Sequence, residues 1–287
     1  MPMRALILVF AAAMLAGVGA ARATTDDVTV TGTKLTKQAA RERADSFVRQ
    51  LQIANSGKQL GRWYDTICPK VIGAPDAEAK RFERRIAAIA RPLGVKARTE
   101  RCDANFIVII SDESTRLIDA LERHAPGEPY SLDPYAFRKL LHSDAPVRWW
   151  YHFGFRAPGA GFLPTSIGQG DGAPIIFKPV ESPRIVVPVT RAINTALIVI
   201  DRRKLVGVPY DTLSAYAAFV GLAEIVAPKQ APPYSVLALC DASSCPVAPS
   251  FTDAALLESV YKAEDQRDGL YHRIAVTNAL AARLEGK

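Results

Sequence analysis

The sequence has few of the histidines and cysteines that commonly hold zinc. Its four histidines are His124, His142, His152 and His272, and no two of them stand four residues apart. A His-Glu-x-x-His zinc helix needs that spacing, because one helical turn aims two imidazoles at one ion while the glutamate activates the bound water. The sequence therefore excludes this class of zinc hydrolase site. Its four cysteines contain no Cys-x-x-Cys motif, so we expect no cysteine-rich zinc site either.

Motifs for other common chemistries are also missing. The chain has no Gly-x-Ser-x-Gly elbow and no P-loop, and "GQGDG" at 168–172 does not follow a strand and open a helix as a dinucleotide site requires. Ser259 and Lys262 match Ser-x-x-Lys, but the Ser-x-Asn and Lys-Thr-Gly motifs that accompany this nucleophile are absent downstream. Asp268 and His272 have metal-ligand spacing; we interpret them as a first-turn helix Asp and a surface His. We assign no catalytic, cofactor-binding or metal-binding residue and expect no cofactor.

The chain also lacks a long cationic tract. Basic residues occur in short groups, at 80–85 and 201–204, interleaved with acids. No recognisable nucleic-acid motif accompanies them, so we expect no nucleic-acid partner.

The first residues have the composition of a secretory leader. Arg4 precedes an apolar run at 5–21, and Ala21-Arg22-Ala23 is a small-x-small cleavage pattern. We predict a signal peptide at 1–23 and export to the periplasm; a retained membrane anchor is the alternative. No later run is long enough to span a membrane. Removing Arg4 and Arg22 lowers the net charge from +7 to +5.

Four cysteines suit an oxidising compartment. Three pairings are possible, and we favour Cys68 with Cys102 and Cys240 with Cys245, because each pair falls in one local neighbourhood. Cys68 lies in a β-rich stretch and Cys102 just before a buried strand, so neighbouring strands would bring them together.

Hydrophobic periodicity predicts an α+β fold, with a mixed sheet packed against helices. Helices are expected at 36–54, 76–94, 114–123, 133–142, 210–226, 252–263 and 267–284. Strands are expected within 62–73 and at 105–111, 147–155, 184–189 and 195–201, with a long Gly/Pro-rich loop at 156–174. We divide the chain into the signal peptide, an N-terminal extension with a helix at 24–60, and one domain at 61–287.

The stretch "VRWWYHFGF" at 147–155 is the most unusual candidate surface. Alternation sends Trp149, Tyr151, Phe153 and Phe155 to one face and Trp150 and His152 to the other. A strand buried on both faces is one interpretation. The alternative is a ligand or partner surface, since Trp, Arg and His favour recognition sites. Its candidate residues are Arg148, Trp150, His152 and Arg156.

Several segments carry a family resemblance. They are "WYDTICPKVIG" at 63–73, "CDANFIVI" at 102–109, "INTALIVID" at 193–201, "LSAYAAFVGLAEI" at 213–225 and "SFTDAALLESVYKAEDQRDG" at 250–269. In this order they resemble a group of exported proteobacterial proteins, which in turn resembles a family of secreted zincin-like metallopeptidases. The resemblance implies a zincin-like architecture. Where a zinc helix carries its ligands, however, this chain has Val220, Gly221 and Glu224, so the resemblance carries over no catalytic residue.

These observations lead to one expectation of function. We expect a non-catalytic binding or assembly factor on a degenerate zincin-like scaffold, with residues 147–175 as the contact region and another envelope protein as a partner. The alternative is a secreted, peptidase-like hydrolase with an atypical active site near His152 or His272.

Overall fold

The computed structural model describes residues 35–55, 58–124, 134–156, 189–240 and 244–286. Within them a four-stranded mixed sheet has the order β1-β2-β4-β3. Strand β1 (Pro69–Ile72) pairs parallel with β2 (Phe106–Ser111), β2 pairs parallel with β4 (Thr190–Asp201), and β3 (Val147–Arg156) closes the sheet antiparallel to β4. The structure thus confirms the α+β class. Pro69 is tolerated because β1 is an edge strand.

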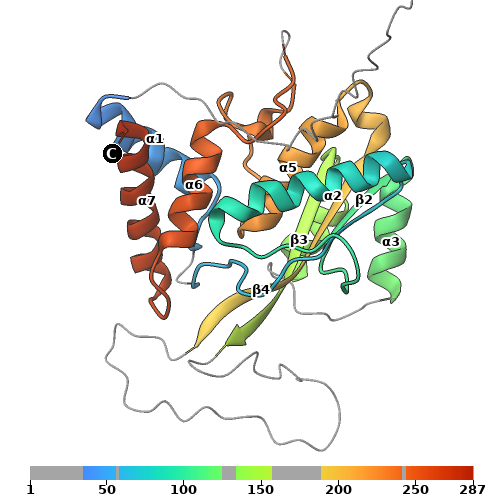
Figure 1. The fold of residues 1–287 in the computed structure, drawn as a ribbon, viewed down its shortest axis with the longest axis horizontal. Coiled ribbons are helices and arrows are strands. Elements are labelled where there is room, and N and C mark those ends of the chain that lie inside the picture. The colour runs from blue at the N-terminus through green and yellow to red at the C-terminus, as the bar shows by residue number, and fades with distance from the viewer. Residues whose placement is uncertain (1–34, 56–57, 125–133, 157–188, 241–243, 287) are drawn as a thin grey trace, which may run out of the picture.

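Helices cover both faces of the sheet (Figure 1). The larger core lies on the face with α2 (Asp76–Ala90) and α5 (Tyr210–Leu222), and it continues into α1 (Lys37–Gln50), α6 (Phe251–Lys262) and α7 (Gly269–Glu285). On the opposite face, α3 (Ser114–His124) and α4 (Pro134–Leu141) enclose a smaller cluster. The helix of the predicted N-terminal extension therefore shares the main core. Among the described residues, no helix has the length and apolar content to cross a membrane.

Helix α5 is the most buried element. Every residue from Thr212 to Leu222 is buried, so the helix has no solvent-facing side. A helix that is apolar on all sides packs inside a protein, and α5 lies between the sheet and the other helices. It lies close against the sheet at Gly221, where an added Cβ would lie 2.1 Å from the ring of Phe106. Glycine is required there because the ring fills the place of a side chain.

Both predicted disulfides are present. Cys68 and Cys102 are bonded with a Cα–Cα distance of 6.0 Å, next to the paired strands β1 and β2. Cys240 and Cys245 are bonded with a Cα–Cα distance of 4.1 Å. Neighbouring parallel strands hold the first pair together, as expected.

Two strand predictions need correction. Within 62–73 only Pro69–Ile72 is a strand, because the preceding residues run as an extended segment that bonds two other parts of the chain: Arg62 accepts from the Ile193 N–H and Gly61 from the Glu224 N–H. Strand β4 begins at Thr190, earlier than the predicted 195, since it pairs along the whole of β3. The signal peptide, all but the last residue of the strand at 184–189 and most of the loop at 156–174 lie outside the described residues.

The close packing of Gly221 leads to a stability prediction. We expect Gly221→Ala to lower the free energy of unfolding by about 1–3 kcal/mol in urea titrations, because the new methyl group overpacks the core against Phe106. Removing the ring should relieve the clash, so Gly221→Ala should cost less in a Phe106→Leu background. Equal costs in both backgrounds would show that Phe106 is not the obstacle.

Candidate functional site

The C-terminal end of α5 is held by aromatic donors. The last carbonyls of a helix have no partner within the helix, and in a buried helix water cannot supply one. Here the Trp63 Nε1–H donates to the Gly221 carbonyl at 2.8 Å, and the Tyr261 hydroxyl donates to that of Leu222 at 2.5 Å. We refer to these two residues, with Trp149 and Tyr151, as the aromatic cap.

Strand β3 supplies the other half of the cap. The Tyr151 hydroxyl lies 2.5 Å from the Val220 carbonyl and 2.9 Å from that of Ala223, and it accepts from the Ile225 N–H at 3.0 Å. The Trp149 Nε1–H donates to the Ile225 carbonyl at 2.7 Å. Burial raises the pKa of Tyr151 well above its ordinary value, so this hydroxyl keeps its proton and remains a donor.

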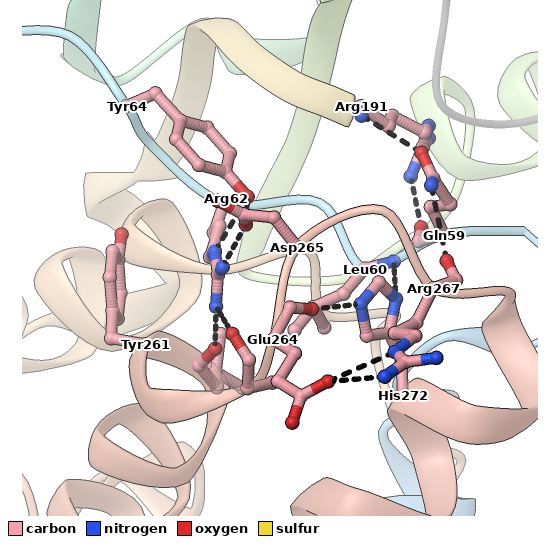
Figure 2. A network of polar contacts seen from close by, with 12 residues as sticks. Gln59, Leu60, Arg62, Tyr64, Arg191, Tyr261, Glu264, Asp265, Arg267 and His272 are labelled. Atoms are coloured by element: carbon pink, nitrogen blue, oxygen red, sulfur yellow. Dashed lines mark hydrogen bonds and ion pairs between the residues drawn. The ribbon is translucent and has the colours of Figure 1, made fainter. Parts of the chain in front are cut away.

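A set of polar side chains joins the segment at 59–65 to the connection between α6 and α7 (Figure 2). Arg62 is its centre: Nη1 donates to the carbonyls of Val260 and Ala263 at 2.5 and 2.8 Å, and Nη2 pairs with Asp265. A guanidinium at these carbonyls caps the end of α6 with favourable charge. The set, here called the polar network, comprises Gln59, Arg62, Tyr64, Arg191, Glu224, Asp265 and His272.

His272 holds the same connection by both ring nitrogens. Nδ1 accepts from the Leu60 N–H at 3.1 Å, and Nε2 lies 2.7 Å from the Glu264 carbonyl, which can only accept. This pattern requires the neutral tautomer with its proton on Nε2. The side chain is 4% exposed, so the expectation of a surface histidine was wrong; the ring is buried because it satisfies two backbone groups. Asp268 is the N-cap of α7, accepting from the Tyr271 N–H.

The second branch of the polar network neutralises Glu224. Both carboxylate oxygens pair with the guanidinium of Arg191, which also donates to the Gln59 carbonyl and lies 3.4 Å from the centre of the Phe153 ring. Both side chains are nearly buried. Glu224 is therefore held in an ion pair with Arg191.

Part of the polar network reaches the surface at Tyr64. The guanidinium carbons of Arg62 and Arg156 lie 5.2 and 5.5 Å from the centre of its ring, and Nε of Arg62 donates to its hydroxyl at 2.9 Å. Arg156 also pairs with Asp65 at 3.3 Å. The surface at this end of β3 thus combines aromatic rings with charges of both signs.

The four candidate surface residues do not share one surface. Arg148 is 1% exposed and donates to the Leu141 carbonyl at 2.7 Å, and Trp150 is buried in the cluster under α3 and α4. His152 and Arg156 are partly exposed. From Arg148 to Arg156 the strand runs roughly 25 Å at the usual rise per residue. The structure confirms that most of β3 is buried on both faces. A partner surface on this strand is therefore limited to its C-terminal end at Arg156, here called the far end of β3.

The positions at which a zinc helix carries its ligands are filled here by residues that pack in the core. The side chain of Val220 is buried in the main core, and Gly221 lies against Phe106. Helix α5 ends at Leu222, so Glu224 is no longer on the helix. Groups of three or more potential ligands that could hold a metal are absent from the described part of the chain.

Sequence reasoning missed Arg62, Arg191, Tyr261 and Asp265. Each acts on a segment far away in the sequence, and no spacing pattern marks such pairs. A weak signal was available for Arg62, which is a charged residue beside Trp63 at the start of a β-rich stretch.

No protein-family model, curated protein or solved structure matches this chain.

The aromatic cap predicts a strong effect of one hydroxyl. Tyr151→Phe keeps the ring but leaves buried backbone groups of α5 and Ile225 unpaired, so we expect a loss of about 2–4 kcal/mol in the free energy of unfolding. Tyr271→Phe is the matched control, since Tyr271 is partly exposed, and it should change stability by less than about 0.5 kcal/mol. Similar losses in both variants would argue against the cap.

His272 predicts a pH dependence of stability. Burial lowers its pKa below the ordinary value of 6.5, so as the pH falls the unfolded chain takes up this proton before the folded chain does. The contribution of His272 to stability is therefore complete above about pH 6.5 and decreases from there down to its folded-state pKa. Urea titrations at pH 7.5 and 5.0 should show a larger loss in the wild type than in His272→Gln, which cannot titrate. The same loss in both proteins would contradict the assignment.

Proposed function

We propose that this chain is an exported, non-catalytic binding or assembly factor on a zincin-like scaffold, in which α5 is a packing element. One observation carries the proposal: the helix that follows β4 is buried on all sides and its end is held by the aromatic cap. A catalytic helix must instead present polar groups to a substrate. The mixed sheet, with its antiparallel edge strand β3 and a helix after β4, supports the zincin-like part of the proposal.

The commitments of the polar side chains support the absence of catalysis. A general base needs an unoccupied acceptor within reach of the substrate. Both nitrogens of His272 are used by backbone groups, and both oxygens of Glu224 are used by Arg191. His272 is one of the two histidines near which an atypical hydrolase site was expected, and Glu224 stands at a zinc-helix position; here each makes contacts that stabilise the fold.

The contact region of this factor is the far end of β3. Phe155 is 42% exposed there, beside the partly exposed Arg156 and His152, and Tyr64 and Asp65 adjoin Arg156. Aromatic and arginine side chains contribute strongly to protein interfaces. A periplasmic location, with another envelope protein as the partner, follows from the leader and agrees with the two disulfides.

Metal analysis tests the non-catalytic assignment. Purified mature protein, residues 24–287, should contain well under one zinc per chain by mass spectrometry, and its melting temperature should not change with a chelator. Glu224→Gln should lower the free energy of unfolding by roughly 3 kcal/mol, because it leaves Arg191 buried without its partner, and zinc content should not change. Glu258→Gln, in a more exposed pair, is the matched control.

A different result would reject the proposal. Tightly bound stoichiometric zinc that disappears in Glu224→Gln would identify a metal site. Hydrolysis that stops on chelation and returns with added zinc would identify an enzyme.

A further inference from the structure

A cavity of about 670 Å³ lies between the C-terminal end of α1 and the segment at 227–234. Its size falls within the range of about 300–1,000 Å³ that is usual for ligand pockets. None of its lining residues belongs to β3, so it is separate from the contact region proposed above. The polar lining residues are Ser46, Gln50, Gln52, Lys229, Gln230 and Tyr234.

The walls of this cavity are stiff. Pro228, Pro232 and Pro233 restrict the backbone of the segment, and the Val226 N–H ties it to the Leu51 carbonyl at 3.0 Å. On the other wall, Gln52 adopts a φ of 52°, which is uncommon for a residue with a side chain. A cavity formed before its ligand arrives loses little conformational entropy on binding.

The lining favours a ligand with a negative charge. Among the described lining residues, Lys229 is the only ionisable side chain besides Tyr234, and none is a carboxylate. Lys229 is exposed and forms no ion pair with a described residue. An ammonium group on a stiff wall without a counter-charge is a ready partner for a carboxylate.

Three glutamines give the cavity a pattern of neutral amides. A side-chain amide carries the same donor and acceptor as a peptide group, so it can pair with an extended main chain. Gln50 donates to Ser46 Oγ at 2.8 Å and Gln52 accepts from Asn55 at 3.1 Å. No hydrogen bond between described residues uses the Gln50 oxygen, the Gln52 NH₂ group or the amide of Gln230, so these groups are available to a ligand.

The aromatic residue of the cavity favours a peptide over a saccharide. A sugar ring is best held by an open aromatic face, but Arg43 lies over the Tyr234 ring at 4.6 Å and the Phe47 ring meets it at 5.7 Å. We propose that the cavity binds the carboxylate end of a short extended peptide, with Lys229 on the carboxylate and the glutamine amides on the main chain. This names a ligand class for the proposed binding function and rests on it, because the peptide is held and not cleaved.

Calorimetric titration of the mature chain with two matched probes tests this site. Acetyl-trialanine has a free carboxylate, and its C-terminal amide lacks one. We expect saturable binding of the acid at one site, with the amide at least about tenfold weaker, because only the acid forms the charge-assisted contact. Lys229→Met should raise the Kd of the acid about tenfold and leave that of the amide unchanged. Gln230→Met should weaken both probes.

Controls separate this site from general charge and from the proposed function. Lys80→Met removes an exposed lysine on α2, outside the cavity, and should leave both affinities unchanged. The inference is overturned if the wild type shows no saturable binding up to millimolar acid, if Lys229→Met binds the acid as the wild type does, or if a trimer of N-acetylglucosamine binds in its place. Cleavage of the peptide, followed by mass spectrometry, would instead reject the non-catalytic function and leave the binding site in place.

Discussion

The fold depends on satisfying the backbone at the end of a buried helix. Helix α5 brings its full circumference into the core, which stabilises the protein through burial of apolar surface but removes water from its last carbonyls. Trp63, Tyr151 and Tyr261 supply the missing donors, and Trp149 pairs the carbonyl of Ile225 just beyond the helix. Each combines a large apolar body with one polar group, so the same residue fills core volume and pairs a carbonyl. The register of β3 and the path of the segment at 59–65 both follow from this requirement.

The polar network likewise pairs backbone groups next to the aromatic cap, in the connection between α6 and α7. Arg62 and His272 bind backbone groups of the connection between α6 and α7, and Gln266 in that connection adopts a φ of 58°. A strained residue persists only where its surroundings hold it, and these two side chains do so. The residues with the most reactive chemistry in this region are thus used for structure. Their commitment is the physical basis of the proposal that the chain binds without catalysis.

The two regions proposed for binding lie outside the aromatic cap and the buried part of the polar network. At the far end of β3 and beside the segment at 227–234, side chains are partly exposed and retain hydrogen-bonding capacity. Both regions are attached to stiff elements, one to the edge strand of the sheet and the other to α1 and a proline-rich wall. A stiff scaffold that presents a few adaptable polar groups is suited to recognition.

The sequence by itself determined the α+β class and the approximate positions of the described helices and strands, because these depend on local periodicity. It also favoured, among three possible pairings, the two disulfides that are present. It also indicated correctly that β3 alternates between two faces. It could not show that Arg148 and Trp150 are buried, that His272 bonds Leu60, or that Glu224 pairs with Arg191. Those outcomes join residues separated by tens to hundreds of positions, such as Leu60 and His272. Only the tertiary structure decided them, because a buried polar group takes whichever partner the packing of distant segments brings within hydrogen-bonding distance.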